Sequence, residues 1–124
     1  MKKLAFVISG GLLCLCFSVR ADAPFMEHST GFFAEPMPLQ ECLSKGQKAF
    51  SHLGITLKAS TNPRNEVVGF SGDYKIVLYC VSDEGGCDAP EEPIANGGTV
   101  MVAGPEYAKT KSWVDKVKQQ LHLN

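Results

Sequence analysis

The sequence predicts an α+β fold of two layers, a sandwich in which an N-terminal and a C-terminal helix cover one face of a three- to four-stranded, mostly antiparallel sheet. Two observations support this prediction. Apolar residues recur at helical spacing near both ends of the chain, and between them the apolar period falls to two in segments separated by short turn clusters. Short links between strands favour antiparallel pairing, so the strands are expected to form a meander beneath the helices.

Length and composition allow a single domain, because the chain has 124 residues, 20% of them charged, and a formal net charge of -1. Residues 1–21 have the pattern of a signal peptide: Lys2 and Lys3 precede an apolar stretch from Leu4 to Phe17, and cleavage is expected after Ala21. We therefore expect an exported protein, periplasmic or secreted, without a membrane span.

Cleavage after Ala21 changes both the charge and the cysteine count of the working chain. Loss of Lys2, Lys3 and Arg20 leaves 9 of the 12 basic residues beside all 13 acidic ones, a net charge of -4, and three of the five cysteines remain. A chain without a basic excess cannot neutralise a run of phosphates, which argues against a nucleic-acid binder. An oxidising compartment favours one disulfide and leaves one thiol over.

Residues 22–38 contain three prolines and show no apolar period, so we expect an extended N-terminal arm in front of a single domain over residues 39–124. The arm either lies loosely over the domain or docks on a partner through its Phe and Met residues. A first helix is predicted from about Pro38 to Leu53, and Gly54 supplies its stop. Its apolar face contains Leu39, Cys42, Leu43, Gly46, Ala49, Phe50 and Leu53.

Strands are predicted over about 55–60, 66–70 and 74–81, and the last has the β-branched and aromatic composition of a central strand. Residues 82–98 combine glycines, prolines and acidic side chains, which predicts a long acidic loop. A short strand over 99–103 then leads to a second helix that starts at Pro105 and Glu106. The apolar face of this helix contains Tyr107, Thr110, Val114, Val117 and Leu121.

The three remaining cysteines are Cys42, Cys80 and Cys87. Cys42 lies on the apolar face of the first helix, and Cys80 shares the inward side of the third strand with Ile76 and Leu78, so a disulfide between these two is favoured. Pairing of Cys80 with Cys87 stays open as the alternative, because the segment between them contains two glycines and could turn. With the first pairing Cys87 is a free thiol among carboxylates, which disfavour the thiolate and argue against catalysis.

Three features of the sequence are candidates for partner binding. Tyr79 lies on the side of its strand away from Cys80, so a sheet face without helices would be open to a protein partner or a second copy. Trp113 in the second helix either covers the edge of the core or anchors a partner. The loop could steer a basic partner or offer oxygen ligands, although its spacing is not that of an EF-hand and no metal site is predicted. Its acidic residues are Asp83, Glu84, Asp88, Glu91 and Glu92.

The sequence lacks a nucleophile elbow, a paired-histidine zinc motif and a phosphate loop, so no enzyme activity and no cofactor are predicted. The function it favours is binding of a macromolecular partner, a protein or an envelope component, as an inhibitor or immunity-type protein does. A homodimer is a further possibility. The alternative function is a periplasmic carrier of a small ligand or metal ion that uses the acidic residues 83–92.

Overall fold

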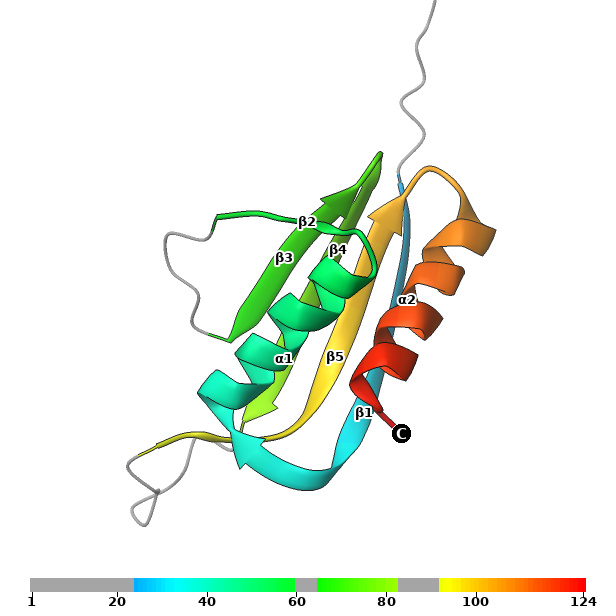
Figure 1. Cartoon of the computed structure of the whole chain (residues 1–124). Helices are drawn as coiled ribbons and strands as arrows, with labels where there is room; N and C mark the ends of the chain where they lie inside the picture. Colours follow the sequence, from blue (N-terminus) through cyan, green and yellow to red (C-terminus); the bar gives the residue numbers. More distant parts are fainter. Residues whose placement is uncertain (1–23, 60–64, 83–91) are drawn as a thin grey trace, which may run out of the picture.

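The computed structural model describes residues 24–59, 65–82 and 92–124, which form a five-stranded sheet and two helices (Figure 1). Neighbouring strands are all antiparallel, in the order β1-β5-β4-β3-β2. Both helices lie on the same face of the sheet in Figure 1, so the predicted α+β layout is confirmed. The elements are β1 (Phe25–Pro38), α1 (Leu39–His52), β2 (Thr56–Leu57), β3 (Glu66–Ser71), β4 (Tyr74–Ser82), β5 (Ile94–Gly104) and α2 (Tyr107–Leu121).

The prediction of three or four strands is wrong, because the N-terminal segment forms a further strand, β1, at one edge of the sheet. β1 pairs with β5 from Phe25 to Phe32 and, after a bulge, again at Met37 and Pro38. The segment is extended, as expected, but it belongs to the sheet. Its apolar side chains lie on both faces of the strand, and this hides the period of two that a half-buried strand normally shows.

Two other strands differ in length from the prediction. β5 begins at Ile94 rather than at residue 99, so Gly97 and Gly98 lie within a strand and not in the predicted loop. A Cβ atom on Gly97 would collide with the backbone oxygen of Gly31 on β1, so glycine is required there by the close approach of two strands. β2 is only two residues long, shorter than the strand predicted over about 55–60.

The core lies between the helix layer and the sheet. Cys42 of α1 and Cys80 of β4 are both fully buried there and form a disulfide with a Cα–Cα distance of 6.3 Å, which confirms the favoured pairing. Both helices bury the faces that the sequence indicates, except that Tyr107 is exposed and Leu53 is only partly buried. The other fully buried apolar side chains include Phe50, Ile76, Leu78, Val100, Val102, Val114 and Val117.

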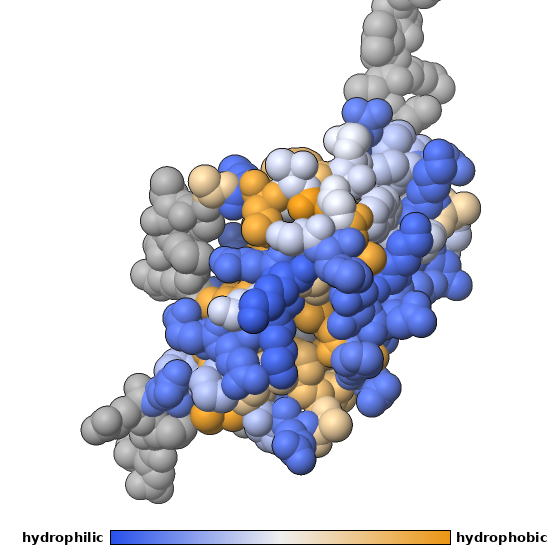
Figure 2. All heavy atoms as spheres, viewed as in Figure 1, coloured by the Kyte–Doolittle hydropathy of each residue, from blue (hydrophilic) through white to orange (hydrophobic). Residues whose placement is uncertain are grey.

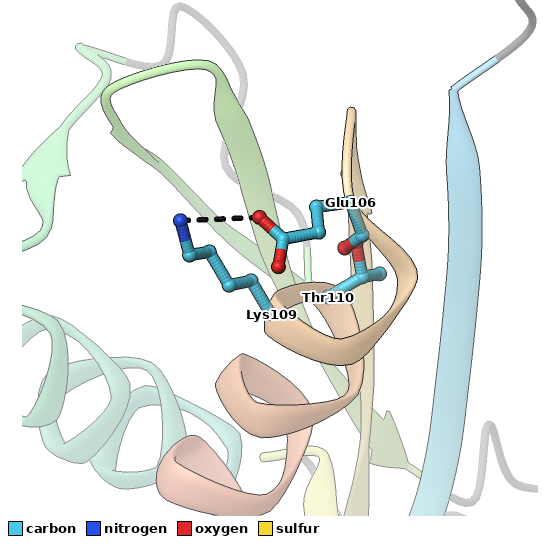
Figure 3. Close-up of polar contacts among 3 residues, drawn as sticks. All are labelled: Glu106, Lys109 and Thr110. Atoms are coloured by element: carbon cyan, nitrogen blue, oxygen red, sulfur yellow. Dashed lines mark hydrogen bonds and ion pairs between the residues drawn. The ribbon is translucent and has the colours of Figure 1, made fainter.

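Glu106 organises the first turn of α2 through both its backbone and its side chain (Figure 3). Its carbonyl oxygen accepts hydrogen bonds from the Thr110 hydroxyl, at 2.8 Å, and from the Thr110 backbone N–H, at 3.0 Å. Its carboxylate lies 3.1 Å from the Lys109 ammonium, and this hydrogen bond and charge raise the pKa of Lys109. Thr110 is the one fully buried polar side chain in the described part of the chain, and its own helix satisfies it.

Candidate binding surface

The sheet face opposite the helices is covered by no second layer within residues 24–59, 65–82 and 92–124 (Figure 1). Along β4 the side chains of Ile76, Leu78 and Cys80 are buried, while Val77 and Tyr79 point away from the helices. Tyr79 thus lies on the uncovered side, where the sequence places it. We call this surface the open face. It comprises Met26, His28, Thr30, Phe32, Glu66, Val68, Phe70, Lys75, Val77, Tyr79, Val81, Thr99, Met101 and Ala103.

Strand register arranges the open face in rows that cross four strands. The central row is His28, Met101, Val77 and Val68. One neighbouring row is Met26, Ala103, Lys75 and Phe70, and the other is Thr30, Thr99, Tyr79 and Glu66. The centre of the face is therefore apolar, with one cation and one anion at opposite sides of it.

Hydrogen bonds between side chains hold part of the open face in place. The hydroxyl groups of Thr30 and Thr99 lie 2.8 Å apart across β1 and β5. Asn65 Nδ2 donates to the Tyr79 hydroxyl at 3.5 Å, from the residue that precedes β3. Because the surrounding side chains stand on paired strands, most of the face is fixed before any partner binds.

Five large apolar side chains on the open face are strongly exposed to solvent. Met26 is 70% exposed and Phe32 63%, and the exposed fractions of Tyr79, Phe70 and Met101 lie between 36% and 42%. Apolar residues gathered on one rigid surface commonly mark an interaction site, whereas single exposed apolar residues do not. The gathering of these five on one face is thus the informative observation.

The helix side has a different character. Figure 2 shows polar side chains over both helices, with hydrophobic residues visible between them. A shallow groove of about 580 Å³ lies where the end of β1 meets the two helices, and it is lined by Phe33, Glu35, Met37, Lys45, Lys48, His52 and His122 among others. Lys45 is paired with Glu41 at 3.1 Å, with both side chains half exposed. The groove is thus lined by both charged and apolar side chains.

The other predicted binding residues are not brought together with Tyr79. Trp113 lies on α2, half-buried against the core, with the Lys116 ammonium 4.9 Å from the centre of its ring. This placement fits a side chain that covers the edge of the core. Glu92 is exposed. The remaining residues of the predicted loop site, Asp83, Glu84, Cys87, Asp88 and Glu91, lie outside the described residues.

The sequence pattern did not predict that Met26, Phe32 and Met101 share one surface. Met26 and Phe32 were expected in an arm, and only the pairing of β1 with β5 places them beside Met101. The available signal was the spacing of Met26, His28, Thr30 and Phe32, which share one strand face at a period of two.

Among the described residues, no three His, Cys, Asp or Glu side chains gather as metal ligands would. None of the helices in the described ranges is long and apolar enough to cross a membrane. Comparison with known proteins adds no relative: no family model matches the chain, and neither a curated protein nor a solved structure is significantly similar to it.

Proposed function

We propose that this chain is an exported binding protein that docks on a folded protein of the cell envelope through the open face. The observation that supports this proposal is the uncovered apolar centre of the sheet, where Met26, Tyr79 and Met101 are exposed on neighbouring strands. In its finer form the proposal is an inhibitor or immunity-type protein, which acts by occupying its partner and performs no catalysis.

The construction of the sheet favours binding by this face. The two strands at its centre, β4 and β5, are paired on both sides, and the Cys42–Cys80 disulfide ties β4 to α1 behind it. A surface that is already ordered loses little conformational entropy on association, so more of the apolar contact contributes to affinity. Lys75 and Glu66 flank the apolar centre and would orient the partner by charge.

The test begins with a photo-reactive amino acid at position 79, incorporated in cells and irradiated to identify the partner. The purified partner is then titrated against the wild-type chain and against Met101→Glu. We expect Met101→Glu to weaken binding by at least about tenfold, because it places a charge at the apolar centre of the contact. Gln47→Glu, at an exposed position on α1, is the matched control and should leave affinity unchanged.

The acidic loop is tested in the same titration by neutralising Asp83, Glu84, Glu91 and Glu92 together. If this variant loses binding while Met101→Glu retains it, the loop is the binding site and the open face is not. Unchanged affinity for both variants would contradict any role of either surface. Thermal unfolding of each variant separates lost contacts from lost structure.

The carrier function stays a prediction that rests on the acidic residues 83–92, most of them outside the described residues. Native mass spectrometry of the chain purified from the export compartment tests it directly. A bound ion or small molecule would support the carrier, and the mass of the chain alone would count against it.

A further inference from the structure

The edge strand β1 leaves part of its backbone without a strand partner. Phe32 directs both its N–H and its C=O away from β5, because they bond to Asn124 at 2.9 and 3.2 Å. Backbone groups alternate in direction along an antiparallel strand, so Met26, His28 and Thr30 also direct theirs outward. Hydrogen bonds farther along the sheet agree with this alternation. The Cys80 backbone N–H donates to the Asn65 carbonyl oxygen on the β3 side, so it points away from β5. Within the described residues, no backbone group bonds the outer side of Met26, His28 or Thr30.

Apart from the charge of Glu27, this edge lacks the features that usually prevent strands from pairing. From Phe25 to Thr30 β1 contains no proline, no lysine and no bulge. The bulge lies beyond Phe32, and the C-terminal residue Asn124 already occupies the edge at Phe32. Among the described residues this edge is therefore free, and its free length ends before Phe32.

We propose that a second copy of this chain pairs with that edge, β1 against β1 in antiparallel orientation, with the twofold axis at His28. His28 then pairs with His28 of the other copy, and Met26 with Thr30, so three residues of each chain exchange backbone hydrogen bonds. The two sheets become one continuous sheet of ten strands, since each contributes five. This dimer goes beyond the proposed function and leaves both open faces exposed.

The register follows from the residues on the edge. Moving the axis to Glu27 would place two like charges opposite each other and bring Pro24, which has no N–H, into the ladder. Moving it to Ser29 would pair Met26 with Phe32, whose backbone groups are already bonded to Asn124. Only the axis at His28 pairs all three outward-directed residues with one another and keeps the two Glu27 carboxylates apart.

Charge complementarity identifies the occupant as a copy of the same chain. With the axis at His28, Glu27 of each copy lies directly opposite Ser29 of the other, at a Cβ–Cβ separation of about 5 Å. The Ser29 hydroxyl accepts a hydrogen bond of 3.0 Å from the Lys118 ammonium on α2, and both side chains are half-buried. Glu27 has no ion pair within the described part of one chain. In the dimer, Glu27 of each copy therefore lies near Lys118 of the other copy. Without such a cation, the Glu27 charge would oppose the pairing of the two strands.

The helix layer is compatible with this arrangement. α2 packs against both β1 and β5, so its axis lies over the boundary between these two strands. With strands about 4.8 Å apart, the two α2 axes would be separated by about 10 Å, which is a normal distance between packed helices. Lys111 and Asp115 are exposed and lie at helical spacing from Lys118 on α2, so each half of the contact would contain two cations and two anions.

Charge exchange tests the proposal on the exported chain by sedimentation velocity. The wild type should dimerise, and Glu27→Lys and Lys118→Glu should each weaken the dimer by at least about tenfold. An equimolar mixture of the two variants should dimerise again, because every contact in the mixed dimer then joins opposite charges. Lys48→Glu, exposed on α1, is the control and should dimerise like wild type. Two variants that both stay monomeric when mixed would overturn the proposal.

A cysteine pair tests the register independently, in a Cys87→Ser background that removes the third cysteine of the exported chain. His28→Cys should form an intermolecular disulfide, because paired residues in this position have Cα atoms about 5.5 Å apart. Thr30→Cys should not, because the two copies of residue 30 lie about 14 Å apart along the strands. A monomeric wild type, equal crosslinking at both positions, or a dimer that Met101→Glu alone abolishes would contradict the edge pairing.

Discussion

At Gly97 the absence of a side chain decides how closely two strands can lie. A Cβ atom at this position would overlap the backbone oxygen of Gly31 and come within 3.1 Å of the Phe32 Cα. Both obstacles belong to main chain, which cannot rotate aside as a side chain can. Glycine in a strand interior normally weakens the strand, so its presence here reflects the approach of β1 and not a turn.

We predict that Gly97→Ala destabilises the protein by about 1–3 kcal/mol, the usual range for an added atom without space. The added methyl group would push β1 away from β5, so protection of the β1 amides against hydrogen exchange should fall together with the urea midpoint. Ser44→Ala, at an exposed position on α1, is the control and should change stability by less than about 0.5 kcal/mol. An unchanged urea midpoint for Gly97→Ala would contradict the close packing of β1 on β5 at this position.

At the scale of elements, the disulfide joins the first helix to the central strand of the sheet. Cys42 is in α1 and Cys80 in β4, 38 residues apart in sequence, and both are fully buried. Gly46 on the same helix face lets α1 approach β4, since a Cβ there would come within 2.5 Å of a Leu78 methyl group. The crosslink and the small residue thus act together on one contact between helix and sheet.

Replacing Cys42 and Cys80 by Ala together should lower the free energy of unfolding by about 4 kcal/mol, the value that loop closure predicts for a separation of this size. Urea unfolding with and without reductant measures the change, and reductant should have no further effect on the double variant. Cys87→Ser should leave the midpoint unchanged. The opposite pattern, in which Cys87→Ser is the destabilising change, would show that the native pairing is different.

At the scale of the whole molecule, the first and last segments of the described chain complete each other. β1 forms one edge of the sheet, and the C-terminal residues Leu123 and Asn124 pack and bond against its Gly31 and Phe32. α2 covers both β1 and β5 between these contacts. The N-terminal strand is therefore a structural part of the fold.

A chain that starts at Pro38 should consequently fail to unfold cooperatively, because β5 loses a neighbour and α2 loses half of the surface it covers. A chain that starts at Asp22, after the predicted signal peptide, should unfold in one transition. Circular dichroism during heating distinguishes the two outcomes. If the chain from Pro38 unfolds with the same midpoint as the longer one, β1 contributes little to stability.

Part of the open face could be derived from local pattern. The alternation of Ile76, Leu78 and Cys80 with Val77 and Tyr79 placed the buried and open sides of β4 correctly. The helical spacing around Cys42 did the same for α1, so the disulfide followed from two local patterns. Which other residues belong to the open face depends on which strands are neighbours. Local pattern does not show this, because pairing between β1 and β5 joins residues about 70 positions apart.

By itself the sequence predicted the layers, the helices and the burial of their faces, because each depends on the spacing of side chains within a single element. It favoured the Cys42–Cys80 disulfide but left the pairing of Cys80 with Cys87 open. Only the tertiary structure decided that residues 25–38 are a strand, that Gly97 and Gly98 lie in the sheet, and that the outer edge of β1 up to Thr30 has no backbone partner within the described residues. These features depend on contacts between distant segments. Local periodicity does not record such contacts, least of all in a strand with apolar side chains on both faces.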